Sequence, residues 1–117
     1  MKTLKFFSFF VFLSLIIACS KDKTAPVITV TSPAEGAVLE RGKTYPVVGT
    51  VTDDEELASI NAGGVNITTF DSPTKHTFAN FTLPIPATAT VGASSFKVSA
   101  TDKEGNAAEK TVNFTVK

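Results

Sequence analysis

The chain has 117 residues, 43% of them hydrophobic and 19% charged, and its 11 basic and 11 acidic residues balance. A chain of this length forms one domain with a modest core and leaves no room for a large enzyme cleft. Because the charge is balanced without a basic patch, and no DNA- or RNA-binding motif is present, we do not expect the chain to bind nucleic acid.

The amino terminus has the pattern of an export signal. The first five residues carry two lysines, and the residues from Phe6 to Ala18 are almost wholly apolar. This run of roughly 13 residues is too short to cross a bilayer, which takes about 20. The only cysteine in the chain, Cys19, follows directly. We therefore predict that residues 1–18 are a targeting segment that is not part of the fold.

The stretch Ile16-Ile17-Ala18-Cys19 resembles the lipobox of bacterial lipoproteins. In that family the cysteine sulfur is acylated and the chain is cut before it, so the resemblance implies a mature protein that begins at Cys19 and is anchored to a membrane by covalent lipid. The alternatives are an ordinary secretory signal and an uncleaved transmembrane anchor. A lone exported cysteine without a disulfide partner counts against the first alternative, and the short apolar run counts against the second.

The residues behind the cysteine bear on the destination. Gram-negative lipoproteins without Asp after the cysteine usually travel to the outer membrane, so the resemblance and Ser20 imply that membrane. The stretch Ser20-Lys21-Asp22-Lys23 also resembles the charged tracts that direct some lipoproteins outward, although it is less acidic than the most acidic of them. We expect a protein on the cell surface of a Gram-negative bacterium, lipid-anchored in the outer membrane.

Residues 19–25 form a tether in this interpretation, and residues 26–117 have the pattern of an all-β domain. β-Branched residues are abundant and suit a pleated surface. Alternation is clearest in two sets that we expect in the core, Phe96, Val98 and Ala100, and Val112, Phe114 and Val116. Strands are predicted at 27–31, 44–52, 57–62, 65–70, 76–83, 96–101 and 111–117, with a short edge piece at 37–40 and a hairpin turn at Gly63-Gly64.

About seven strands without a helical run predict an immunoglobulin-like β-sandwich. Three stretches, APVITVTSPAEG (25–36), GTVTD (49–53) and VSATDKEGN (98–106), resemble bacterial Ig-like modules of surface proteins, of the cadherin or fibronectin-III kind. The resemblance covers nearly all of the predicted mature chain and implies the fold. It says little about a ligand, because such folds carry many functions.

Two acidic loops are expected to meet at one pole of the sandwich. The candidate ligands there for Ca²⁺, which takes six to eight oxygens, are Asp53, Asp54 and Asp102. Neighbouring side chains in an extended loop diverge, and the spacing of a dedicated calcium loop is missing. We therefore expect solvated turn acids, no tight calcium site and no cofactor other than the lipid at Cys19.

The other polar candidates have structural interpretations. Asp102, Gly105 and Asn106 suit a tight hairpin, because Asp can accept bonds from the following backbone while Gly and Asn tolerate positive φ. The only histidine, His76, lacks a Cys, His or Ser partner and is expected at the surface or on an edge strand. The aromatic residues expected in the core are Tyr45, Phe70, Phe78, Phe81, Phe96 and Phe114.

These patterns favour a non-enzymatic module for adhesion, assembly or the binding of a glycan or protein. The alternative is a purely structural accessory subunit of a larger surface complex for uptake or secretion. A calcium-dependent adhesion module is a more distant alternative. An enzyme is not expected, since no His, Cys or paired-acid arrangement provides a mechanism.

Overall fold

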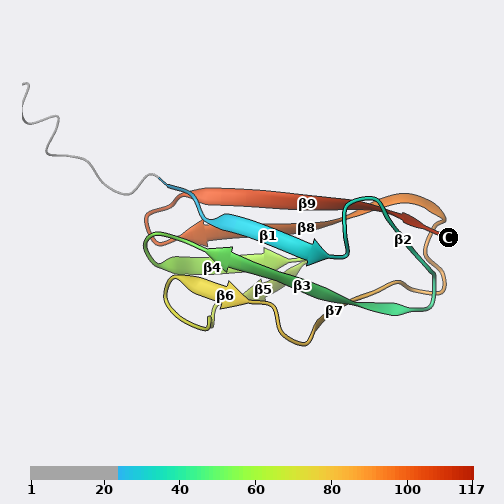
Figure 1. Ribbon diagram of the computed structural model, residues 1–117, viewed down its shortest axis with the longest axis horizontal. Helices are drawn as coiled ribbons and strands as arrows, with labels where there is room; N and C mark the ends of the chain where they lie inside the picture. The colour runs from blue at the N-terminus through green and yellow to red at the C-terminus, as the bar shows by residue number, and fades with distance from the viewer. Residues whose placement is uncertain (1–23) are drawn as a thin grey trace, which may run out of the picture.

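The computed structural model describes residues 24–117, which form two packed β-sheets (Figure 1). The predicted signal segment 1–18, Cys19 and most of the predicted tether lie outside the described residues. In the first sheet the strand order is β1-β3-β6, and β7 pairs with the other half of β3. Its strands are β1 (Val27–Ser32), β3 (Thr44–Thr52), β6 (Lys75–Thr77) and β7 (Phe81–Pro84).

The second sheet has the order β2-β9-β8-β4-β5. Its strands are β2 (Ala37–Leu39), β9 (Ala107–Val116), β8 (Gly92–Asp102), β4 (Leu57–Ala62) and β5 (Val65–Ile67). The short β2 runs parallel to β9, and all other pairs are antiparallel. The predicted all-β sandwich is confirmed, with nine strand segments in place of about seven.

Four strand predictions differ from the structure by more than one residue. β8 begins at Gly92 and β9 at Ala107, before the starts predicted at 96 and 111. The strand predicted at 65–70 ends at Ile67, so Thr69 does not continue the face of Val65 and Ile67. The strand predicted at 76–83 is two strands, because Asn80 has a φ of 57° and turns the chain between them. Backbone in this left-handed region cannot continue a strand, which explains the interruption.

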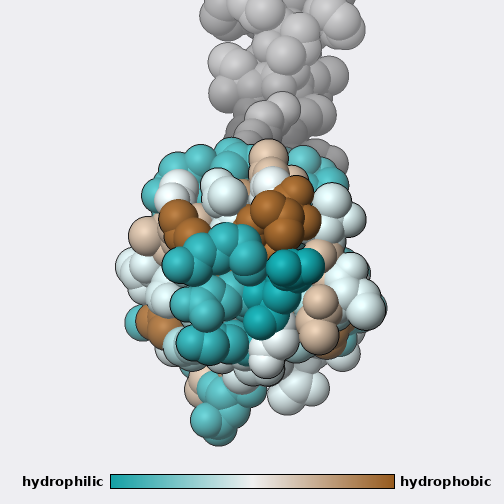
Figure 2. All heavy atoms as spheres, turned by 90° about the vertical axis from the view of Figure 1, so that its right-hand side faces the viewer, coloured by the Kyte–Doolittle hydropathy of each residue, from teal (hydrophilic) through white to brown (hydrophobic). Residues whose placement is uncertain are grey.

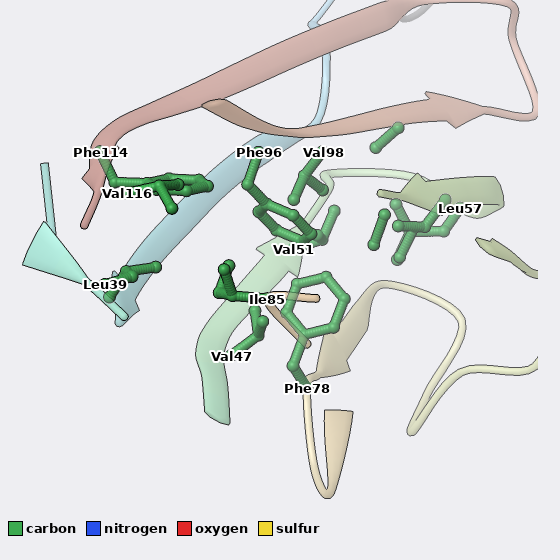
Figure 3. Close-up of a cluster of buried hydrophobic side chains, with 13 residues drawn as sticks. Leu39, Val47, Val51, Leu57, Phe78, Ile85, Phe96, Val98, Phe114 and Val116 are labelled. Carbon is green, nitrogen blue, oxygen red and sulfur yellow. The ribbon is translucent and has the colours of Figure 1, made fainter. Parts of the chain in front are cut away.

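The core lies between the sheets and is built from alternate residues of their strands (Figure 3). Phe96, Val98 and Ala100 are buried, as is the β9 set, so both sequence predictions of inward faces are confirmed. Tyr45, Phe70 and Phe81 are partly buried against the same core. The buried residues of the cluster are Leu39, Val47, Val51, Leu57, Ile60, Ala62, Phe78, Ile85, Phe96, Val98, Ala100, Phe114 and Val116.

The described chain enters and leaves the sandwich at opposite ends (Figure 1). We call the end with the start of β1 and the loops 53–56 and 103–106 the proximal pole. The opposite end, with the loops 40–43 and 85–91 and the end of β9, is the distal pole. This polarity decides which surfaces lie near an anchor at the amino terminus and which lie away from it.

Gly49 on β3 is predicted to tolerate no side chain. A Cβ atom at this position would meet the backbone carbonyl oxygen of Thr29 and the Cα of Val30, both on β1. Since backbone atoms cannot rotate away, the strands must separate, and Gly49→Ala should cost about 1–3 kcal/mol of unfolding free energy. Chemical denaturation measures this cost.

Gly64→Ala is not a suitable control, because its φ of 92° adds backbone strain of its own. Val48→Ala on the exposed side of the same strand is suitable and should change stability by less than about 0.5 kcal/mol. Equal effects of the two substitutions would contradict the β1–β3 register.

Candidate functional site

The proximal pole brings together the two acidic loops. The backbone N–H of Lys103 donates to the carbonyl of Glu56 at 2.8 Å, and the side chains of the same two residues form an ion pair with Nζ to Oε1 at 2.9 Å. The β4–β8 register explains this contact, because Leu57 lies opposite Asp102. The loop 53–56 is thus joined to the loop 103–106 by one backbone bond and one exposed ion pair.

Asp102 is the one buried charged residue among the described residues, at 1% exposure. Its Oδ1 accepts the backbone N–H of Glu104 at 2.9 Å and that of Asn106 at 2.8 Å, and its Oδ2 accepts the Asn106 side-chain amide at 3.0 Å. Gly105 has a φ of 92°, which glycine adopts without steric cost. The carboxylate therefore holds the β8–β9 hairpin closed from inside.

The candidate calcium ligands do not form a cluster. Asp53 accepts the backbone N–H of Glu55 through Oδ2 at 2.9 Å, whereas Asp54 is exposed. Asp102 is occupied within its own hairpin. Within residues 24–117, no three His, Cys, Asp or Glu side chains come together as a metal-binding group. The geometry of Asp53 and Asp102 is that of residues that cap turns.

A hollow of about 470 Å³ lies beside the ion pair of the proximal pole. It opens because β5 ends at Ile67 while β4 extends to Leu57, whose N–H bonds instead to the carbonyl of Pro73 at 2.8 Å. Asp71 in its wall accepts the backbone N–H of Thr77 at 2.9 Å, which ties the hollow to the edge strand β6. The lining includes Glu56, Thr68, Thr69, Phe70, Asp71 and Lys103. Hydroxyls, one aromatic ring and charges of both signs can bind a small polar molecule.

His76 lies on the edge strand β6, as expected, but its side chain is only 15% exposed. Its ring packs edge-on between Phe70 and Phe78, with ring centroids 5.8 and 5.4 Å apart. Its Nδ1 lies 4.0 Å from the carboxylate of Asp71, beyond hydrogen-bond distance. The predicted edge-strand position is confirmed, but the ring is mostly buried there and does not lie at the surface. The ring acts as an aromatic neighbour at the border of the core.

The distal pole carries a second hollow, of about 550 Å³, lined by Glu40, Arg41, Ala87 and Lys117. Figure 2 views this end of the molecule. Hydrophilic residues gather in its middle and hydrophobic residues form separate spots around them. The pole is fixed by backbone bonds, since Arg41 N–H donates to the carbonyl of Lys117 at 3.1 Å and Gly42 N–H to that of Ile85 at 2.6 Å. The Tyr45 hydroxyl accepts the N–H of Glu40 at 2.8 Å.

Glu35 fastens the β1–β2 turn to β9. Its carboxylate accepts the backbone N–H of Asn113 at 3.1 Å and the Asn113 side-chain amide at 3.0 Å. These two bonds hold the pKa of Glu35 below its ordinary value of 4.5, with a smaller contribution from the charge of Lys110. A lowered folded-state pKa means that the stabilisation is present above the ordinary value and is lost as the pH falls through the folded value.

The pH dependence of stability should therefore change when Glu35 is replaced. At about pH 6 the wild type should be more stable than Glu35→Gln, and this difference should shrink as the pH falls below 4.5. Thermal unfolding of both proteins between about pH 6 and pH 3 provides the measurement. A difference that stays constant over this range would show that the carboxylate charge does not hold the turn.

Sequence patterns did not indicate several of these contacts. Glu35 and Asn113 are 78 residues apart, and neither stands in a local motif that would pair them. The hydrogen bond and ion pair between Glu56 and Lys103 follow from the register of β4 and β8. The alternation of apolar and polar residues does not determine this register. The proximal hollow depends on the early end of β5. The contact between Pro73, whose carbonyl accepts the N–H of Leu57, and β4 depends on this same edge.

These features define an all-β domain of the immunoglobulin and fibronectin(III)-like class. The part of the chain from Thr24 to Lys117 contains no helix with the length and hydrophobicity that crossing a bilayer takes.

A comparison with a solved structure agrees with this fold. The chain is similar in structure to the fibronectin(III)-like modules of CbhA from Clostridium thermocellum, with 24% identity over 77% of this chain and 94% of that chain and a TM-score of 0.53. It also aligns with SGBP-B of the Bacteroides ovatus mixed-linkage glucan utilization locus, solved with a mixed-linkage heptasaccharide. That match has 21% identity, covers 70% of this chain and 23% of that chain, and has a TM-score of 0.31. No protein-family model and no curated protein matches the chain.

Proposed function

We propose that the protein is a lipoprotein in which acylated Cys19 anchors a non-enzymatic Ig-like module to the bacterial outer membrane, where the module serves in adhesion, assembly or the binding of a glycan or protein. The observation that carries this proposal is the succession of an apolar run, Ile16-Ile17-Ala18-Cys19, and then a sandwich whose first strand begins at Val27. The short distance between cysteine and strand suits a domain held close to a membrane.

Lipid chemistry explains how the anchor would work. Each buried methylene contributes about 0.8 kcal/mol, so that one acyl chain binds reversibly whereas two or three hold a protein firmly. Acylation also consumes the thiol of Cys19, the only cysteine, which would otherwise stay unpaired in an oxidising compartment.

A lipid anchor at Cys19 would also orient the module. From Cys19 to Val27 the chain can span at most about 28 Å. The proximal pole would stay near the membrane, while β9, of ten residues, places the distal pole about 33 Å further along the sandwich. The distal pole and the outer faces of the two sheets are thus the surfaces that a partner could reach.

A binding role is supported by how the acidic residues are used. Asp102 holds a hairpin and Asp53 caps a loop, and Glu35 fastens a turn. Each carboxylate is thus engaged in backbone hydrogen bonds that serve the fold. The polar hollows and the exposed sheet surfaces are the features suited to non-covalent binding.

Replacing Cys19 tests the anchor. In cells fed labelled palmitate the wild type should become labelled and sediment with membranes, whereas Cys19→Ala should carry no label and leave the membrane fraction. Ser20→Ala is the matched control and should keep both properties. Equal labelling of the wild type and Cys19→Ala would rule out lipidation at this residue.

A further inference from the structure

The outer face of the first sheet has an unusual composition. Alternation along β1, β3, β6 and β7 places twelve side chains on it, and seven of them are threonines. We call this surface the threonine face. It turns toward the viewer in Figure 1, and no other described element crosses it. Its residues are Val27, Thr29, Thr31, Thr44, Pro46, Val48, Thr50, Thr52, Lys75, Thr77, Thr82 and Pro84.

The strand register aligns several of these threonines in rows. Thr29 lies opposite Thr50, and Thr50 lies opposite Thr77, so that three threonines cross the sheet side by side. Neighbouring strands are about 4.8 Å apart, and successive outward residues of one strand are about 6.7 Å apart. The face therefore presents hydroxyl and methyl groups at regular intervals.

Charge is almost absent from this surface. Lys75 is its one ionisable residue, whereas the outer face of the second sheet carries the ion pair of Lys97 and Glu109, with Nζ to Oε2 at 3.6 Å. Depletion of charged residues marks the centre of binding surfaces, since charges are costly to desolvate. Threonine and valine also have restricted χ1 angles, so a partner orders them at little entropic cost.

The size and chemistry of the face select among partners. It measures about 30 by 14 Å, or roughly 400 Å², so two copies packed face to face would bury about 800 Å² in total, less than the roughly 1,200 Å² of a specific interface. It has no aromatic or arginine side chain to anchor a protein partner. A single lysine gives an anionic polymer little attraction. A surface with many hydroxyl groups and almost no charge is complementary to a neutral ligand that is itself rich in hydroxyl groups.

We infer that the threonine face binds a neutral polysaccharide that lies along the sheet. Threonine hydroxyls donate and accept hydrogen bonds with sugar hydroxyls, and the methyl groups of threonine, with Val27 and Val48, contact the C–H surfaces of the rings. This inference rests on the proposed function and assigns a ligand class to the anchored module. Each contact is weak, but several modules on one membrane can bind one polymer together and gain avidity.

The test uses a variant that removes hydroxyls and keeps shape. The triple variant Thr29→Val, Thr50→Val, Thr77→Val retains β-branched side chains across the central row. The matched control is Thr101→Val, Thr111→Val, Thr115→Val, which makes the same change on the outer face of the second sheet. The purified full chain in detergent is run by affinity electrophoresis through gels that contain a soluble neutral glucan, a neutral galactomannan or anionic polygalacturonate.

At least one neutral polysaccharide should retard the wild type and the control equally, and the row variant should bind about tenfold more weakly or worse. The single variant Thr50→Ser, which keeps the hydroxyl, should bind like the wild type. The inference is overturned if no neutral polysaccharide retards the wild type, if only polygalacturonate does, or if the row variant and the control lose binding equally. A stable dimer in sedimentation, lost in the row variant, would assign the face to a second copy instead.

This assay and the palmitate assay fail independently. Electrophoresis of the purified chain measures binding whether or not Cys19 is acylated. Labelled Cys19 without polysaccharide binding would leave the lipid anchor in place and remove the threonine face as its ligand site. Polysaccharide binding without labelling of Cys19 would keep the threonine face as a ligand site and would rule out the lipid anchor.

Discussion

Phe114→Ala is expected to lower the free energy of unfolding by about 3–5 kcal/mol, because it leaves a cavity in the core as large as an aromatic ring. Phe114 is 5% exposed and points between the sheets from β9, near Leu39 and Val116 (Figure 3). Its strand is joined to β8 over ten residue pairs and to β2 over three, so that the surrounding backbone is poorly able to collapse into the gap. Urea denaturation of both proteins measures the difference.

The neighbouring Thr115→Ala is the control for this substitution. Thr115 lies on the exposed side of the same strand, where changes usually stay within about 0.5 kcal/mol. A loss below about 1 kcal/mol for Phe114→Ala would mean that β9 presents its other face to the core.

Asp102→Ala is expected to cost about 2–4 kcal/mol, because it removes the acceptor of two backbone N–H groups and one side-chain amide. A buried or partly buried donor left without an acceptor costs about 1–3 kcal/mol. The loss should be concentrated in the β8–β9 hairpin. Hydrogen exchange of the amides of Glu104 and Asn106 should therefore accelerate more than exchange in the centre of β8.

Two further substitutions separate this role from a general effect of charge. Asp102→Asn keeps one carbonyl oxygen as an acceptor and should cost less than Asp102→Ala. Asp54→Ala removes an exposed acid from the neighbouring loop and should change stability by less than about 0.5 kcal/mol. Similar losses for Asp54→Ala and Asp102→Ala would point to charge balance at the proximal pole in place of the hairpin hydrogen bonds.

The sequence predicts the regular part of this fold because the sandwich buries one side of each long strand. Alternation in β8 and β9 identified the inward residues Phe96, Val98, Val112 and Phe114. The bounds of β3 and β4 were predicted as the structure has them, and Gly63-Gly64 forms the expected turn with φ values of 58° and 92°. In these segments local pattern and tertiary burial favour the same structure.

The irregular edge of the first sheet was not predictable by the same reasoning. The run from His76 to Leu83 alternates well enough for one strand, but positive φ at Asn80 divides it, so that β6 and β7 pair with separate halves of β3. His76 is buried because its ring packs against Phe70 and Phe78. Both residues are recognisable in the sequence as aromatic, but the sequence does not show that they enclose the imidazole ring. Tertiary contacts decide both features.

The candidate sites also differ in whether the sequence alone could predict them. Asp102, Gly105 and Asn106 form a local motif, so their hairpin could be anticipated from spacing alone. The threonine face depends on the register between β1, β3 and β6, which places Thr29, Thr50 and Thr77 in one row. Each strand alone shows ordinary outward threonines. Only their alignment produces a surface with repeated hydroxyl groups and a single charged residue, Lys75.

Intact-mass and peptide mass spectrometry of the protein extracted from membranes tests the lipid anchor most directly. We predict a mature chain that begins at Cys19 and carries the added mass of two or three acyl groups on that residue. A mature chain that begins at another residue, or an unmodified Cys19, would contradict the lipid anchor on which the proposed function depends.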